Sequence, residues 1–304
     1  MTVKNLENTL STHLINTASC IYSGNPMYHP VVITNAVKNI LGDTRSNPSN
    51  NLLEFIDKHY QPFEKRSNDN IYLQNIDKKE IGLTAFISDL EDACQNADKA
   101  NAQKHLARIY LASDGSPVIL QNLAELGLQN IEENGSFIYH CLRAFAFAPE
   151  KERIWIFLQC VLHVLFNKKL PKPHKSVNIE SLDINMFIIN SNSPKELNTL
   201  ASVWRLWESD YTRLPGFKRE ISFWANKYYN EQEINTNEQN PDALNNYLNN
   251  QNDYFVLLAE EIIQSNIEID ERLITLESLR YFTKRVDIKY LPAVAHKINS
   301  LMKI

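Results

Sequence analysis

Apolar side chains recur along this chain at spacings of three and four residues, which is the period of an amphipathic α-helix. The stretch DLEDACQNADKANAQKHLARIYLA (89–112) has this spacing, with Leu90, Ala93 and Cys94 on one face. The same spacing is present in PVILQNLAELGLQNI, SPKELNTLASVWRLWESDY, ALNNYLNNQNDYFVLLAEEII and DERLITLESLRYFTKRV. The pattern predicts an all-α protein of roughly a dozen helices, paired as antiparallel helical hairpins in a bundle or a short solenoid-like array.

Helix-start signals support this prediction. A polar residue followed by proline suits the first turn of a helix, because proline lacks an N–H that would have no partner there. Such pairs occur at His29-Pro30, Asn47-Pro48, Ser116-Pro117, Ser193-Pro194 and Asn240-Pro241. Ser193 is also followed three residues later by Glu196, which predicts a capping box.

The chain is expected to form a single all-helical domain over residues 1–304. A basic, proline-bearing stretch, NKKLPKPHKSV (167–177), marks a possible sub-division. It would separate an N-terminal helical half, 1–168, from a C-terminal helical half, 176–304.

Composition narrows the function classes. Only seven of 304 residues are glycine, which argues against sheet folds and phosphate-cradling glycine loops, and no such loop, nucleophile elbow or zinc-finger spacing is present. The net charge of −5 gives no electrostatic reason to expect nucleic acid as a partner. The longest apolar run, IWIFLQCVLHVLF (154–166), is too short to span a membrane. Four scattered cysteines and a polar N-terminus favour a cytoplasmic location.

Two histidines are predicted to face the core. In ENGSFIYHCLRAFAF (133–147), a cap at Asn134 or Ser136 would place His140 on the apolar face of the following helix. The next helix carries Gln159 and His163 one turn apart, and we expect one of them to be the partner of His140. Such a pair could bind a metal or haem or act as acid and base. Equally, His140 could be a core residue that hydrogen-bonds a carbonyl or hydroxyl group.

His29 is a third candidate, because it stands at the entrance of an apolar helix in GNPMYHPVVITNAVKNILG (24–42). A histidine at a helix entrance can face a pocket formed by helix ends, or it can be a surface cap. The sequence contains no HExxH, ExxH or CxxC spacing, so it identifies no metal ligand set and no cofactor.

Three stretches in order resemble one known family. They are NPMYHPVVITNAVKNILG (25–42), LLEFIDKHYQPFE (52–64) and GSFIYHCLRAFAFA (135–148). Over about residues 20–166 the chain is similar to the questin oxidase-like proteins. The resemblance implies an all-helical oxidative enzyme that inserts oxygen into a ring ketone, with His29 and His140 on the histidine-bearing elements. The later element would ordinarily read His-Gly-x-Ile-Arg, whereas this chain has His140, Cys141, Leu142 and Arg143.

Two functional hypotheses follow. The first is an oxidoreductase-like, questin oxidase-like enzyme that acts on a small organic molecule in a buried pocket bearing His29, His140 and His163 as candidate catalytic residues. The second is a non-catalytic helical array that binds another protein, which the absence of catalytic motifs favours. The sequence does not decide whether the protein is an enzyme. Either a small molecule or another protein is the expected partner.

Overall fold

The structure, a computed structural model, describes residues 2–76, 85–147, 149–175, 181–226, 242–250 and 253–303. It is 73% helical, with about 15–16 helices packed together and no strand among the residues described. The all-α prediction is therefore confirmed. The helices outnumber the predicted dozen because short ones such as α4 (Ile71–Gln74) are too brief to show an amphipathic period.

The other helices of the described chain follow one another in short connections. Their bounds are α1 (Val3–Ala18), α2 (Pro30–Leu41), α3 (Asn50–His59), α6 (Ile87–Gln95), α7 (Lys99–Ala112), α8 (Val118–Leu128), α9 (Ile131–Phe147), α10 (Ile154–Leu165), α11 (Ile184–Asn190), α12 (Pro194–Trp207), α13 (Leu214–Ala225), α14 (Asp242–Asn250), α15 (Tyr254–Ser265), α16 (Ile269–Phe282) and α17 (Leu291–Met302).

Two of the predicted helix starts are confirmed with their caps. The Ser193 hydroxyl accepts a hydrogen bond from the Glu196 N–H at 3.2 Å, and Pro194 is the first residue of α12. The Glu196 carboxylate in turn accepts from the Asn192 N–H at 2.8 Å. At α2, His29 itself is the cap, because its Nδ1 accepts from the Val31 N–H at 3.2 Å.

The remaining proline signals mark starts less accurately. Ser49, one residue after Pro48, caps α3 through a hydrogen bond from the Leu52 N–H at 3.1 Å. Helix α8 begins at Val118, directly after Pro117. The pair at 240–241 lies outside the described residues.

The prediction that α9 is capped at Asn134 or Ser136 is wrong. Helix α9 already begins at Ile131, so both residues lie inside it. Gly135 is a packing residue here, since a Cβ on it would lie 3.1 Å from Ile131 Cγ2 and 3.6 Å from Thr199 Cγ2 on α12. Glycine at this point lets α12 approach α9, and does not break the helix.

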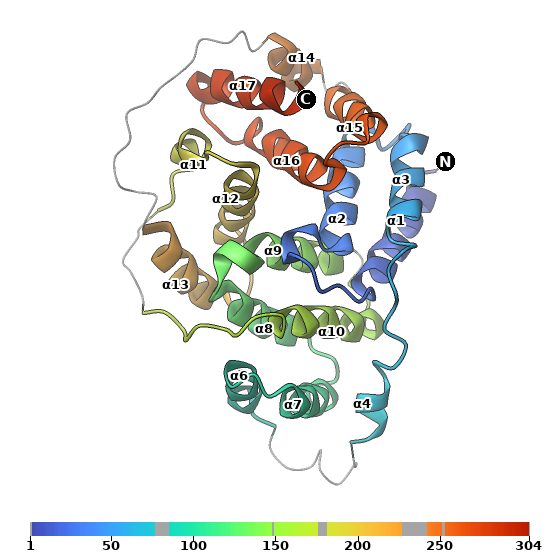
Figure 1. Ribbon diagram of the computed structural model, residues 1–304, viewed down its shortest axis with the longest axis vertical. Helices are drawn as coiled ribbons and strands as arrows, with labels where there is room; N and C mark the ends of the chain where they lie inside the picture. Colours follow the sequence, from blue (N-terminus) through green and yellow to red (C-terminus); the bar gives the residue numbers. More distant parts are fainter. Residues whose placement is uncertain are drawn as a thin grey trace.

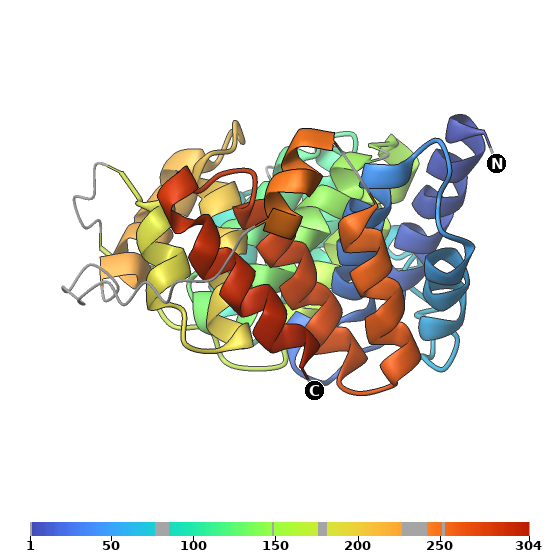
Figure 2. The same cartoon turned by 90° about the horizontal axis from the view of Figure 1, so that it is seen from above.

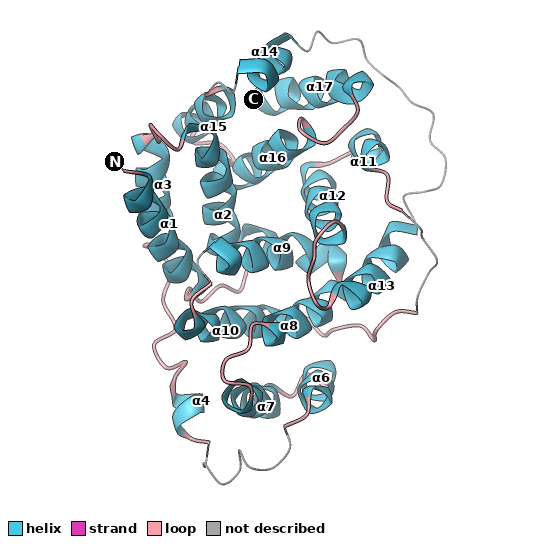
Figure 3. Cartoon of the chain, turned by 180° about the vertical axis from the view of Figure 1, so that it is seen from behind, coloured by secondary structure: helices cyan, strands magenta, loops and turns pink. Residues whose placement is uncertain are grey.

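Four helices surround the centre of the molecule. Helix α9 packs against α2 and α12, and α16 packs against both α2 and α12 (Figures 1 and 3). Helices from before residue 168 and after residue 176 therefore share this region. Seen from above, the C-terminal helices α15, α16 and α17 lie side by side (Figure 2).

Helix α2 is buried on almost every face, because α1, α9, α15 and α16 all pack against it. Its polar side chains are buried with it, including Thr34, Asn35 and Lys38. Buried polar groups are costly unless they find partners. The surroundings of α2 are therefore the natural place to look for a functional site.

None of the described helices combines the length and apolar character that crossing a bilayer requires.

Candidate functional site

His140 lies in the core, and its partner comes from α2. The side chain is 1% exposed, and Asn35 Nδ2 lies 2.8 Å from His140 Nδ1. An amide nitrogen can only donate, so Nδ1 accepts and the proton of the neutral ring is on Nε2. The expectation that Gln159 or His163 would be the partner is corrected by this contact. Sequence spacing compares neighbouring helices, whereas α2 lies 105 residues before His140.

The electrostatic surroundings of His140 keep it neutral. Burial lowers the pKa of His140 to about 3, and the nearby cations Arg205 and Lys38 act in the same direction. The Glu277 carboxylate opposes them without reversing the result. At neutral pH, His140 is a fixed hydrogen-bonding group and not a proton carrier.

His29 belongs to a different cluster. Its Nδ1 accepts the capping hydrogen bond, so Nε2 carries the proton and points to Cys160 Sγ at 3.7 Å. Cys141 and Cys160 interact through a hydrogen bond between their side chains, which raises the pKa of the Cys141 thiol. Within the described part of the chain, no group of three or more histidine, cysteine or acidic side chains has the arrangement of a metal site.

His163 stands on α10, one turn after Cys160 in sequence. Burial lowers its pKa, with Lys99 and Arg66 adding to the effect and His29 contributing a smaller part. Its Nδ1 is enclosed without a hydrogen-bond partner. The structure therefore places His29 and His163 in one electrostatic neighbourhood and His140 among a different set of charges. A catalytic role for the three histidines stays a prediction.

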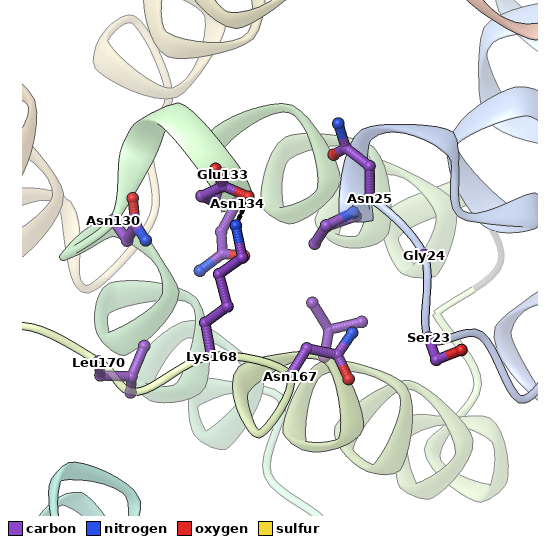
Figure 4. A pocket seen from close by; sticks show the side chains of 11 residues that line it. Ser23, Gly24, Asn25, Asn130, Glu133, Asn134, Asn167, Lys168 and Leu170 are labelled. Carbon is purple, nitrogen blue, oxygen red and sulfur yellow. Dashed lines mark ion pairs between the residues drawn. The ribbon is translucent and has the colours of Figure 1, made fainter.

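Two cavities lie near these clusters. The first, which we call the asparagine cavity, has a volume of about 400 Å³. It is lined by Ser23, Gly24, Asn25, Pro26, Asn130, Glu133, Asn134, Val164, Asn167, Lys168 and Leu170. Figure 4 shows Lys168 extending toward Glu133, to which its Nζ forms an ion pair at 2.8 Å. Its chemistry is that of neutral amides around one surface ion pair.

The second cavity, which we call the arginine cavity, has a volume of about 800 Å³ and lies where α2, α9, α12 and α16 meet. It is lined by Asn39, Gly42, Arg45, Tyr139, Arg143, Ala146, Arg205, Glu208, Ser209, Asp210, Tyr211, Glu277, Arg280, Tyr281 and Arg285. None of the three candidate histidines lines either cavity. His140 is nevertheless adjacent to this one, since its ring contacts that of Tyr139 with centroids 5.0 Å apart.

A buried ion pair forms the floor of the arginine cavity. Arg205 Nη1 donates to Glu277 Oε2 at 2.8 Å, and Asn39 Nδ2 donates to Glu277 Oε1 at 2.9 Å. The Arg205 guanidinium also lies over two aromatic rings, at 4.0 Å from the Tyr281 centroid and 4.9 Å from that of Tyr139. Cation–π contacts of this kind hold a desolvated guanidinium in place.

The pKa values on this floor follow from the pairing. Burial alone would raise the pKa of Glu277, but Arg205 and His140 hold it below its usual value. Burial would likewise lower the pKa of Arg205, but Glu277 and Tyr139 more than compensate and raise it. Both groups are therefore ionised in the interior, where each depends on the other.

Three further arginines stand at the rim with exposed guanidinium groups. Arg45, Arg143 and Arg285 are exposed, and among the described residues none of them has a carboxylate within 4 Å. Two carboxylates, Glu208 and Asp210, also line the cavity but pair with none of the described cations. The fifth arginine, at position 280, is neutralised by Asp43 through Nε and Nη2.

Sequence reasoning missed this site because its residues come from four separate helices. No local motif links positions as far apart as 45, 143, 205 and 277. One signal was present: Glu277 follows Leu273 by four residues and Ile274 by three, so a carboxylate stands on the apolar face of a helix. Charged residues are almost never buried without a partner, so such a residue predicts a buried cation.

No family model, no curated protein and no solved structure matches this chain. The functional conclusion therefore depends on the geometry and charge of the site itself.

Proposed function

We propose that this protein binds a small organic anion in the arginine cavity. The observation that carries the proposal is the convergence of three unpaired arginines, Arg45, Arg143 and Arg285, on one cavity of about 800 Å³. Planar guanidinium groups recognise carboxylates and phosphates through paired N–H donors. A cavity of this volume is within the range that encloses a small organic molecule.

The overall charge of the chain makes the local charge informative. The whole protein carries a net charge of −5, yet the arginine cavity is lined by five arginines and three carboxylates. Like charges at one place repel and reduce stability unless an anion neutralises them. An anionic ligand would remove this repulsion and gain from it.

The walls favour a planar ligand. Tyr139, Tyr211 and Tyr281 line the cavity, and the Arg205–Glu277 pair fixes the rings of Tyr139 and Tyr281 from below. Rigid aromatic walls bind flat rings at a low cost in conformational entropy. An aryl or otherwise conjugated carboxylate is the class of ligand that best combines these walls with the rim arginines.

An oxidoreductase-like reaction on this ligand is the narrower form of the proposal. It is supported by the resemblance to questin oxidase-like proteins over residues 20–166 and by the position of His140 behind Tyr139. With its pKa at about 3, His140 would serve such a reaction by positioning Asn35 and Tyr139, not by carrying a proton.

A protein partner is the alternative, and the surface offers it less support. The large exposed apolar side chains belong to separate elements, including Val3 on α1, Phe223 on α13 and Leu257 on α15. Scattered apolar residues are normal on a protein surface, whereas docking surfaces gather them into patches. For this reason we favour the small-molecule form.

Calorimetric titration with matched ligand pairs tests the proposal. We expect benzoate to bind and its uncharged isostere benzamide to bind at least about tenfold more weakly, which corresponds to about 1.4 kcal/mol. Arg143→Gln should weaken benzoate binding, and Lys168→Gln in the asparagine cavity should leave it unchanged. Equal binding of the acid and the amide, or no binding of any aryl acid, would refute the proposal.

A further inference from the structure

A buried lysine borders the arginine cavity. Lys38, on α2, is 8% exposed, and its Nζ lies 4.7 Å from the centroid of the Phe147 ring. Among the described residues it forms no ion pair with a carboxylate. The four charged groups that act on it electrostatically are Arg143, Glu277, Arg45 and Arg205, and all four line the cavity.

The helix geometry directs Lys38 toward the same space. Gly42 and Arg45 follow it four and seven residues later, so the three positions lie along one side of α2 and the turn after it. Both Gly42 and Arg45 line the cavity. A Cβ on Gly42 would meet nothing nearer than Arg45 Nε at 4.0 Å, so the space beside it is open.

The surroundings of Lys38 disfavour its charged form. Burial is the largest cause, and Arg143, Arg45 and Arg205 add three like charges, while Glu277 opposes them. Together they lower the pKa of Lys38 to about 7. His140 and Tyr139 on α9 and Arg280 on α16 are the other titratable groups facing this region. A lysine amine that is uncharged at neutral pH is a nucleophile.

We propose that Lys38 forms an imine with a carbonyl group of the anion bound in the arginine cavity, so that the ligand class is an anionic aldehyde or oxo acid. This inference rests on the proposed function, because the arginines would hold the anionic group. The amine lone pair attacks the carbonyl carbon, and the C–N bond forms as the carbonyl electron pair moves to oxygen. That oxygen takes up protons and leaves as water, which gives a C=N bond and needs no oxidant or reductant.

The rim arginines have two effects on this step. They bind the carboxylate of the ligand, and their charges keep the lysine amine free of its proton. Lysine neighbours of like charge activate amines in this way in general. The same cluster would therefore select the substrate and prepare the nucleophile.

Reductive trapping on the full-length protein tests the inference. The probe is 4-formylbenzoate with cyanoborohydride, which reduces an imine to a stable amine, and peptide mass spectrometry locates the product. At pH 7 the neutral fraction of an amine with a pKa near 7 exceeds that of an ordinary lysine by roughly a thousandfold. We therefore expect Lys38 to be labelled at least tenfold faster than any other lysine.

Lys297 is the matched control. Burial also lowers its pKa, but its Nζ donates to the Ser191 carbonyl at 2.7 Å and no arginine acts on it. Lys38→Met should abolish the fast labelling and leave benzoate binding in place, and its thermal unfolding shows whether it folds. Neutral benzaldehyde should label Lys38 at least tenfold more slowly than 4-formylbenzoate.

The outcomes separate the two proposals. If benzoate binds but Lys38 is labelled no faster than Lys297, the imine inference is wrong and the proposed function stands. If neither benzoate nor 4-formylbenzoate binds, both are wrong. If benzaldehyde labels Lys38 as fast as its charged analogue, the arginines do not select the substrate.

Discussion

The arginine cavity and the asparagine cavity share helix α9 but use it differently. The first turns of α9 supply Glu133 and Asn134 to the asparagine cavity, and its last turns supply Tyr139 and Arg143 to the arginine cavity. One cavity carries an exposed ion pair, Glu133–Lys168, whereas the other is built over a pair from which water is almost excluded. Burial, and not the residue type, makes the second pair consequential.

This difference shows where the molecule accepts an energetic cost. Surface ion pairs contribute little, and exchanging them changes little. A buried pair with unpaired cations around it is costly to keep, so its presence calls for a function. The contrast can be broken or sharpened by substitutions made in parallel at the two cavities.

The largest effect is expected for Glu277→Gln. The substitution keeps the shape of the side chain but leaves the buried Arg205 cation without its partner, which destabilises the protein by about 3–5 kcal/mol. Glu133→Gln at the asparagine cavity is the matched change and should cost at most about 1 kcal/mol. Urea unfolding of the two variants measures both values, and similar losses would contradict the contrast.

The second effect is a loss of stability in acid that depends on His140. Its pKa is lowered in the folded state, so the unfolded chain takes up the proton first as the pH falls. The contribution is fully present above the unfolded pKa near 6.5 and is lost progressively toward pH 3, by roughly 3–5 kcal/mol. His140→Gln should remove this part of the pH dependence, and the half-buried His163→Gln should remove less. Parallel pH profiles for wild type and His140→Gln would show the assignment to be mistaken.

The third effect concerns the ligand. Arg143→Gln should weaken benzoate binding by about tenfold, or about 1.4 kcal/mol, because it removes a charged donor from the rim. The affinity of the wild type should also fall as salt is added, since the rim arginines are exposed and therefore screened. An affinity that ignores both changes would mean that the rim does not bind the anion.

The smallest effect is expected at the asparagine cavity. Asn167→Ala should change the free energy of unfolding by no more than about 0.5 kcal/mol, because the side chain lies at the surface with no hydrogen bond to a described residue. It should not alter benzoate binding. A large loss of benzoate affinity in this variant would move the site to the other cavity.

The helical period was enough to predict the class of fold and the buried position of His140. The start of α9 was misassigned, because glycine in ENGS was taken for a turn residue when it makes room for α12. Local sequence cannot distinguish these two uses of glycine, since the second depends on a helix about sixty residues away.

The arginine cavity lay beyond sequence reasoning for a related reason. The pairing of Arg205 with Glu277 and of His140 with Asn35 joins positions 72 and 105 residues apart. Spacing rules apply within a helix or between neighbours, and these contacts are set by how α2, α9, α12 and α16 pack. What the sequence did contain was the buried carboxylate at position 277, which signals a cation without saying which one.

The most direct measurement is the location of a bound aryl acid in a crystal of the protein. With 4-bromobenzoate, the anomalous signal of bromine marks the ligand independently of the protein density. The account predicts a peak in the arginine cavity, among Arg143, Tyr211 and Tyr281, with the carboxylate toward the rim arginines. A peak in the asparagine cavity, or no peak at a ligand concentration that saturates binding in solution, would contradict it.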